Sequence, residues 1–131
     1  MTDFPLPYSS IDLTGQVALV TGASSGLGHR FARVLAAAGA SVVATARRVD
    51  RLEALAAEIT AAGGTCVPVQ LDVTDAASIV AAVDAAEAAF GTVTILVNNA
   101  GLPDAQRAHR MSVELVDAVI DTNLRGPYLL A

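Results

Sequence analysis

The chain is 131 residues long, the size of one ordinary domain, and 53% of its residues are hydrophobic, which is enough for a sizeable core. Its formal net charge of −5, with eight scattered arginines as its basic residues, argues against general nucleic-acid or anionic-membrane binding. No apolar run reaches the roughly 18–20 residues that span a bilayer, and the N-terminus lacks the pattern of a signal peptide, so we expect a soluble cytoplasmic protein.

Short β-branched runs alternate with longer alanine-rich segments along most of the chain. Residues 1–15 are predicted to form an irregular arm, because Pro5 and Pro7 interrupt regular structure. Residues 16–131 are predicted to form one domain. Its predicted strands are 17–21, 41–46, 65–71 and 93–97. Pro68 inside the third of these strands predicts an edge position in the sheet.

Helices are predicted between and after these strands. The first two cover 26–38 and 51–62, the third is capped by Thr74 or Asp75 and ends at Gly91, and the last begins at Ser112 and is disturbed by Pro127. The apolar residues expected on the inner face of the first helix are Leu27, Phe31, Val34 and Leu35. Those expected on the last helix, about half of them in a buried face, are Val116, Val119, Ile120 and Leu124.

This alternation of apolar strands with helices predicts an α/β fold with a parallel sheet covered on both faces. The connections between parallel strands are expected to be right-handed crossovers. The sequence therefore predicts a doubly wound, Rossmann-like domain in which a fourth strand and one further helix complete the chain.

A glycine-rich stretch, V-T-G-A-S-S-G-L-G, joins the first predicted strand to the first predicted helix. Gly22 allows a tight turn, Gly26 allows backbone to approach a ligand closely, and Gly28 allows the helix to pack against the strand. The free N–H groups and the positive dipole end of that helix suit a pyrophosphate. Because no G-K-[ST] follows, a P-loop NTPase is not indicated.

This spacing, T-G-x-x-x-G-x-G, resembles the short-chain dehydrogenase/reductase family, and three further motifs stand in the expected order. They are L-D-V at 71–73, N-N-A-G at 98–101 and D-T-N at 121–123. The resemblance covers the chain from about Leu13 onward and corresponds to the N-terminal half of such proteins. A methyltransferase with a related sheet fits these motifs poorly.

The resemblance implies a set of residues that bind the dinucleotide. Those expected to hold the diphosphate are Gly22, Ser24, Ser25, Gly26, Leu27 and Gly28. Asp72 is expected to accept a hydrogen bond from the adenine amino group, with the backbone of Val73 beside it. Asn99, Ala100 and Gly101 are expected to lie behind the adenosine ribose, whereas Asn98 is expected to bond back toward Thr21.

The end of the second predicted strand indicates which coenzyme is used. A carboxylate there would bond the ribose 2′-hydroxyl of NAD, but Ala46 stands at that position and Arg47 follows it. A guanidinium suits a 2′-phosphate, so we expect NADP(H) rather than NAD(H). The alternative is that Arg47 and Arg48 are solvated loop charges.

The family resemblance implies hydride transfer between the nicotinamide and a small carbonyl or alcohol substrate, with Asn123 in a proton relay. The serine and the Tyr-x-x-x-Lys that complete this relay are missing, since the chain has no lysine, and Tyr8 and Tyr128 lie elsewhere. The 131 residues alone are therefore predicted to be inactive. The apolar ending at Ala131 favours the front half of a longer reductase, and the alternative is a stand-alone, non-catalytic nucleotide-binding or interaction module.

No cluster of histidine, cysteine and carboxylate side chains has the spacing of a metal site, so no metal is predicted. His29 is expected to be exposed, and His109 lies in a loop where a substrate contact is conceivable. Cys66 is expected to be a small core residue. The resemblance also implies that the full-length protein is a homo-oligomer.

Overall fold

The computed structural model describes residues 11–131. The part of the predicted arm that contains Pro5, Pro7 and Tyr8 lies outside the described residues. Within them, Ile11 to Gln16 form no helix or strand, and the Leu13 N–H donates to the carbonyl oxygen of Ala38 at 2.8 Å. This bond fixes the entry into the first strand against the end of the first helix.

The sheet has four parallel strands in the order β3-β2-β1-β4. Their bounds are β1 Val17–Val20, β2 Ser41–Ala46, β3 Thr65–Gln70 and β4 Ile95–Val97. The predicted strands are confirmed, and so is the edge position of β3, whose Pro68 pairs in register with Ala44. An edge strand tolerates proline because one side of its backbone needs no ladder partner.

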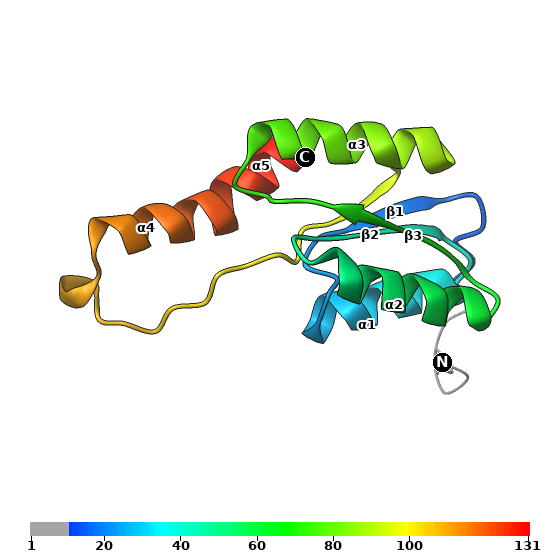
Figure 1. Ribbon diagram of the computed structural model, residues 1–131, viewed down its shortest axis with the longest axis horizontal. Helices are drawn as coiled ribbons and strands as arrows, with labels where there is room; N and C mark the ends of the chain where they lie inside the picture. The colour runs from blue at the N-terminus through cyan, green and yellow to red at the C-terminus, as the bar shows by residue number, and fades with distance from the viewer. Residues whose placement is uncertain (1–10) are drawn as a thin grey trace.

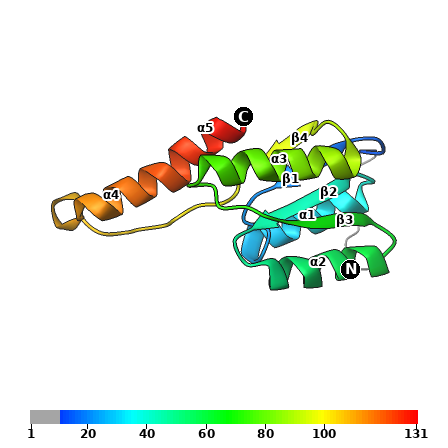
Figure 2. The ribbon, with the colours of Figure 1, turned by 45° about the horizontal axis from the view of Figure 1, so that its top comes forward.

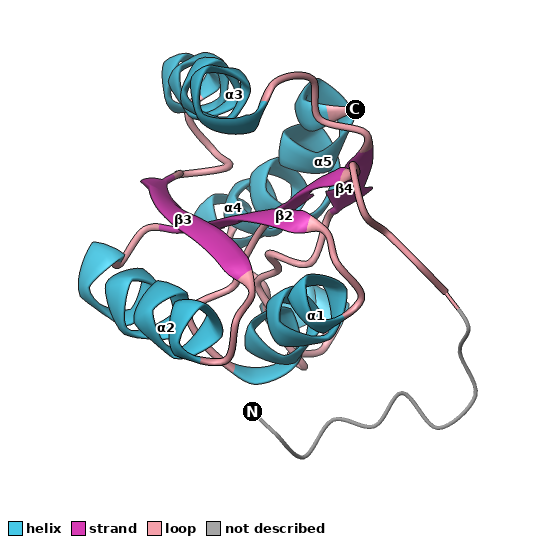
Figure 3. Ribbon diagram, turned by 90° about the vertical axis from the view of Figure 1, so that its right-hand side faces the viewer, coloured by secondary structure: helices cyan, strands magenta, loops and turns pink. Residues whose placement is uncertain are grey.

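Helices cover both faces of the sheet, so the predicted doubly wound fold is confirmed (Figures 1 and 3). On one face lie α1 Gly26–Ala37 and α2 Val49–Ala61, and on the other lie α3 Ala76–Phe90 and the short α5 Gly126–Leu130. Asp75 caps α3 by accepting from the Ala77 N–H at 3.0 Å, and Gly91, with a φ of 87°, ends this helix. Both ends were predicted from the sequence.

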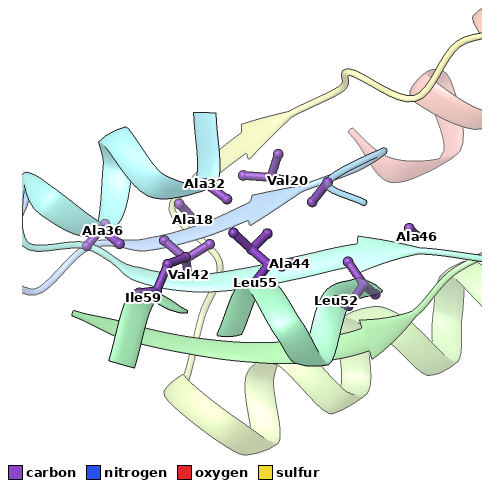
Figure 4. Packing of buried hydrophobic residues seen from close by; sticks show 12 residues of the cluster. Ala18, Val20, Ala32, Ala36, Val42, Ala44, Ala46, Leu52, Leu55 and Ile59 are labelled. Atoms are coloured by element: carbon purple, nitrogen blue, oxygen red, sulfur yellow. The ribbon is translucent and has the colours of Figure 1, made fainter. Parts of the chain in front are cut away.

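The core is divided by the sheet, because successive side chains of a strand point to opposite faces. Ala18 and Val20 of β1 face α1 and α2, where Leu52, Leu55 and Ile59 are buried (Figure 4). Val17 and Leu19 face α3 in a second cluster. Each of the buried Leu and Ile side chains of α2 contributes about 1.5–3 kcal/mol to folding.

The face that α1 buries differs from the predicted one. Leu27 and Phe31 are 65% and 36% exposed, whereas the buried residues are Gly28, Ala32 and Ala36. Because these side chains are small or absent, α1 packs close to the sheet. Of the predicted inner residues, Leu35 packs against the core cluster, whereas Leu27 and Phe31 remain exposed, so helical spacing predicted the helix correctly and its inner face only in part.

The last predicted helix is divided into three segments. α4 Val113–Ile120 is followed by a π-helical turn, Asp121–Arg125, and then by α5, with helical backbone conformation at both junctions. We call residues 113–130 the C-terminal helical segment. Pro127 was expected to disturb this helix, but it lies in the first turn of α5, directly after the wider π turn. Proline has no N–H, and the wider turn accommodates the lost i→i−4 bond.

α4 extends away from the sheet and has no buried residue (Figures 1 and 2). About half of the four apolar residues of the last predicted helix were expected in a buried face, but none of them is buried, and Val116, Ile120 and Leu124 are 36%, 47% and 67% exposed. The described helices include none that is long and apolar enough to cross a membrane.

Cys66 lies on β3 and packs against the core cluster beneath α1 and α2. Its burial raises the pKa of the thiol to about 11. Since the thiolate is the reactive form, this cysteine is chemically quiet near neutral pH. The expectation of a core residue is therefore confirmed.

Candidate functional site

A cavity of about 610 Å³ lies at the carboxyl ends of the four strands. The residues that follow all four strands contribute to its lining, from Thr21 after β1 to Asn99 after β4. In a doubly wound sheet, ligands bind in the crevice outside the carboxyl ends of the strands, at the point where the order of the strands in the sheet reverses. A cavity of this volume can hold a small organic ligand or cofactor.

The three glycines of the loop after β1 have different surroundings. Gly22 has a φ of 65°, and a Cβ there would lie 3.0 Å from the Cα atom of Ala100. A Cβ on Gly28 would overlap the carbonyl oxygen of Gly22. Because glycine has no Cβ, the helix can pass directly beneath the turn. Gly26 has a φ of 58° with nothing within 4 Å of its Cβ position, so the space beside it is open. This open side is where a ligand could approach the backbone.

A buried hydroxyl group joins this loop to the end of β4. Thr21 is 1% exposed, and its Oγ1 accepts from the N–H groups of Asn99 at 3.0 Å and Ala100 at 2.8 Å. In return, Nδ2 of Asn99 donates to the carbonyl oxygens of Thr21 and Gly22 at 3.1 and 3.3 Å. These bonds fix the two loops that border the cavity relative to each other.

The predicted role of Asn98 is wrong. Its Nδ2 donates to the carbonyl oxygen of Pro127 at 3.3 Å, on the opposite side from Thr21. The neighbouring Asn99 makes the bonds that had been assigned to Asn98. Consecutive residues at the end of a strand point in opposite directions, which decides between the two amides.

The N-terminus of α1 offers free donors. Its N-cap residue Ser25 makes no side-chain capping bond, and no acidic residue lies in its first turn. By contrast, α4 begins with a Ser112 cap whose Oγ accepts from the Leu115 N–H at 3.1 Å. The uncapped N–H groups and the positive end of the helix dipole favour an anion beside Ser25.

The end of β2 brings two guanidinium groups to the cavity. Arg47 and Arg48 both line it, and Nη2 of Arg48 lies 3.5 Å from Oγ of Ser24 in the glycine loop. Both arginine side chains are exposed. The cavity therefore has a positively charged rim next to the N-terminus of α1.

Asp72 follows β3 and its carboxylate is held in one orientation. Its Oδ1 accepts from the Thr74 hydroxyl at 2.7 Å and from the Thr74 N–H at 3.0 Å. These two bonds, and to a smaller extent the positive charge of Arg47, lower the pKa of Asp72 below its ordinary value. The carboxylate is therefore ionised at neutral pH and can accept further hydrogen bonds.

Asn123 does not line this cavity. It borders a second cavity of about 410 Å³ together with Leu102 and Pro127. Oδ1 of Asn123 accepts from the Leu102 N–H at 2.7 Å, and its Nδ2 donates to the Leu102 carbonyl oxygen at 3.0 Å. Both ends of the side-chain amide are thus used to hold the loop that follows β4.

The short chain dehydrogenase family model matches residues 16–131. This chain belongs to the short-chain dehydrogenase family. The D-threitol dehydrogenase of Mycolicibacterium smegmatis is 42% identical over 118 residues, which cover 90% of this chain and 45% of that protein. The chain therefore spans about half the length of the relatives it matches.

Solved short-chain dehydrogenase structures have the same fold. A metagenomic short-chain oxidoreductase in complex with NADP has a TM-score of 0.84 and 45% sequence identity, with 89% of this chain and 53% of that chain covered. A blue fluorescent protein from a metagenomic library, in complex with NADPH, has a TM-score of 0.85 and 34% identity, covering 91% of this chain and 49% of that chain.

The cavity brings together most of the site residues that the family resemblance implies. Those that line it are Gly22, Ser24, Ser25, Arg47, Asp72, Val73, Asn99, Ala100 and Gly101. Gly26, Leu27 and Gly28 lie in the first turn of α1 and are not part of the lining, and the side chain of Leu27 is exposed.

Sequence reasoning missed several residues of this short-chain dehydrogenase site. The additional lining residues include Arg48, Thr74, Ala118, Asp121 and Thr122. Arg48 was considered only as a solvated charge, although its place beside Arg47 was a usable signal. Asp121 and Thr122 stand in the D-T-N motif, which was a usable signal, whereas no local signal places Ala118 at the cavity.

The two histidines lie outside the cavity. Nε2 of His29 is 3.5 Å from Oε2 of Glu58, and Nη2 of Arg33 is 3.5 Å from Oε1 of the same residue, so these groups join α1 to α2. His109 is exposed in a short 3₁₀ turn, Ala108–Arg110. Residues 11–131 contain no group of three or more histidine, cysteine or acidic side chains placed to hold a metal ion.

Proposed function

We propose that this chain forms the dinucleotide-binding half of an NADP(H)-dependent oxidoreductase. The full-length enzyme transfers a hydride between the nicotinamide and a small carbonyl or alcohol substrate. The single observation that carries the proposal is the cavity at the strand ends, which joins an uncapped helix N-terminus to a rim of two arginines. The similar structures described with NADP and NADPH support the same ligand class.

The diphosphate of the dinucleotide is proposed to bind at the start of α1. The backbone from Gly22 to Gly28 supplies N–H donors, and the hydroxyl groups of Ser24 and Ser25 lie at the cavity. The absence of a Cβ on Gly26 leaves open space where phosphate oxygens can come close to the backbone. In this arrangement the N–H donors of the loop and the dipole of α1 both stabilise the two negative charges of the diphosphate.

The adenosine is proposed to bind on the β3 side of the cavity. The ionised carboxylate of Asp72 is a suitable acceptor for the adenine amino group, and the backbone of Val73 continues the same surface. Ala100 and Gly101 are proposed to lie against the ribose, on a backbone held by the bonds that the N–H groups of Asn99 and Ala100 donate to Oγ1 of Thr21. A small, rigid backbone surface suits a close-fitting sugar.

The preference for NADP(H) over NAD(H) is proposed to come from the end of β2. The buried Ala46 leaves no acidic group to repel a 2′-phosphate, and Arg47 can bind two phosphate oxygens with its planar fork. Arg48, which reaches Ser24, adds a second positive charge at the same edge. Together the two guanidiniums favour the extra phosphate of NADP.

Asn123 is proposed to serve the proton relay through its backbone carbonyl oxygen, because its side chain is engaged by Leu102. The residue four positions later is Pro127, which has no N–H to bond that carbonyl as a regular helix would. The chain contains no lysine, so the complete relay needs groups from outside these 131 residues. We therefore propose that the 131 residues alone do not turn over substrate.

The full-length protein titrated with NADPH and NADH tests this proposal. Wild type should bind NADPH more tightly. Arg47→Asp should weaken NADPH by about 10- to 100-fold, since hydrogen bonds to charged groups contribute about 1.5–3 kcal/mol, while NADH binding changes little. Arg51→Asp, the same charge change on an exposed residue outside the cavity lining, is the control.

Two results would count against the proposal. Equal losses for both coenzymes in Arg47→Asp would remove the NADP preference. Tight binding with no turnover of any carbonyl or alcohol by the full-length protein would favour the non-catalytic nucleotide-binding module instead.

We also propose that α4 contributes to a contact between copies of the full-length protein. Val113, Val116, Ile120 and Leu124 leave a row of exposed apolar residues on a helix that the described part of the chain does not cover. Exposed apolar surface of this kind marks an interaction site. Light scattering of the full-length protein should show an oligomer that Ile120→Asp weakens, and a monomeric wild type would refute the proposal.

A further inference from the structure

Gly126 is the one buried residue of the C-terminal helical segment. A Cβ at this position would lie 2.6 Å from the carbonyl oxygen of Val73 and 3.0 Å from its Cβ atom. A third neighbour, the carbonyl oxygen of Asp121, would be 3.3 Å away. The helix therefore touches the backbone after β3 directly, through a position that only glycine can occupy without displacement.

This contact lies between the two sides of the larger cavity. Asp72 and Val73 line the side next to β3, while Ala118, Asp121 and Thr122 line the side formed by the helical segment. Ala118 and Thr122 precede Gly126 by steps of four residues, which places all three on about the same helix face. The separation between the two sides of the cavity is therefore set where Gly126 meets Val73.

The helical segment is supported unevenly. Its end is anchored, since Leu130 packs against the cluster of Leu71, Val73 and Ile79. Its beginning, α4, has no buried residue and extends into solvent (Figure 1). A displacement at Gly126 would therefore be passed on toward Ala118, about 12 Å away at 1.5 Å per residue, and between these two positions the segment is held to the loop after β4 by the bonds of Asn123 to Leu102.

We infer that Gly126 is a positioning residue that sets the width of the adenine end of the dinucleotide site. The inference rests on the proposed function, because it assigns the adenine to the side of the cavity next to Asp72 and Val73. A methyl group needs about 3.5 Å from its neighbours, so Gly126→Ala moves the helical segment by roughly 1 Å. The side of the cavity formed by Ala118 and Thr122 moves with it.

The test is Gly126→Ala in the full-length protein, titrated with adenosine 2′,5′-bisphosphate, which carries only the adenine end of NADP. We expect binding to weaken about tenfold or more, because errors of about 1 Å in positioning have effects of this size. The KM for NADPH should rise similarly. The kcat at saturating NADPH should stay within about threefold of wild type, because a saturating coenzyme concentration compensates for weaker binding.

Gly64→Ala is the matched control. A Cβ there would lie 2.8 Å from Cγ2 of Ile59, so the site is also crowded, but it lies between α2 and β3 and outside the cavity lining. Its affinity for adenosine 2′,5′-bisphosphate should match that of wild type. Equal affinities of wild type and Gly126→Ala, or equal losses in both glycine variants, would overturn the inference.

A second variant keeps the test decisive if Gly126→Ala does not fold. Ala118→Leu extends a larger side chain from the helical segment into the cavity and should also weaken adenosine 2′,5′-bisphosphate. Unchanged affinity in this variant would show that the helical segment does not border the adenine site. A wild type that binds neither NADPH nor the bisphosphate would instead refute the proposed function itself.

Discussion

The side-chain amide of Asn123 forms a two-point hydrogen bond with the backbone of Leu102, accepting at 2.7 Å and donating at 3.0 Å. The two residues are 21 positions apart in the chain. This pair connects the π turn of the C-terminal helical segment to the loop after β4.

Asn123→Ala removes both bonds and should loosen the loop after β4. Because each bond contributes about 0.5–1.5 kcal/mol, the free energy of unfolding should fall by roughly 1–3 kcal/mol. Hydrogen exchange of the Leu102 N–H should become faster. Asn98→Ala, which removes a single 3.3 Å bond to Pro127, should leave that exchange rate unchanged. Unaltered exchange in Asn123→Ala would contradict the assignment.

The strands and the parallel sheet follow from the sequence, because continuous apolar runs between helical segments admit few arrangements other than a parallel sheet. The buried face of α1 and the exposure of α4 could not be predicted from the sequence in this way. Large apolar residues usually mark the inner face, but the buried residues of α1 are Gly28, Ala32 and Ala36, and α4 has no buried residue. Small residues give a weak hydrophobic signal even where packing is closest.

The candidate site was only partly predictable for a related reason. The glycine loop and Asp72 stand in local motifs that identify the ends of strands, whereas Ala118 and Thr122 belong to a helical segment that reaches the cavity through tertiary packing. The sequence also assigned the bond toward Thr21 to Asn98 instead of Asn99, because it does not show in which direction each side chain points. Two identical neighbouring side chains differ only in direction, and direction depends on tertiary structure.

Gly28→Ala should destabilise the protein more than Gly26→Ala. A Cβ on Gly28 would overlap the Gly22 carbonyl oxygen and lie 2.5 Å from Nδ2 of Asn99, so backbone must move, and overpacking of this kind costs about 3 kcal/mol. At Gly26 the space is open and only its φ of 58° is unfavourable, at about 1–2 kcal/mol. Urea denaturation of both variants measures the difference, and equal midpoints would refute it.

Thr74→Val should raise the pKa of Asp72 toward its ordinary value near 3.9, because the hydroxyl bond is the largest cause of the lowered pKa. A carboxylate whose pKa is lowered in the folded state stabilises that state above its unfolded pKa, and the stabilisation is lost as the pH falls through the folded pKa. Wild type should therefore be more stable than Thr74→Val at neutral pH, with a difference that shrinks below about pH 4.

Carbon-13 NMR titration of the Asp72 carboxyl group measures this pKa directly. Thr74→Ser keeps both the hydroxyl and the backbone N–H and should titrate like wild type. If Thr74→Val titrates at the same pH as wild type, the hydroxyl bond does not control the carboxylate.

Thr21→Val should disrupt the junction between the glycine loop and the end of β4. The valine side chain has the same shape but cannot accept the two hydrogen bonds from the N–H groups of Asn99 and Ala100. The Asn99 N–H keeps its bond to the carbonyl oxygen of Val97 at 3.0 Å, whereas the Ala100 N–H loses its described partner, so the free energy of unfolding should fall by roughly 1–3 kcal/mol. Thr21→Ser retains the hydroxyl and should lose much less, because it removes only a buried methyl group. Chemical denaturation of the two variants measures this order, and a Thr21→Val protein as stable as Thr21→Ser would show that the hydroxyl group does not hold these loops together.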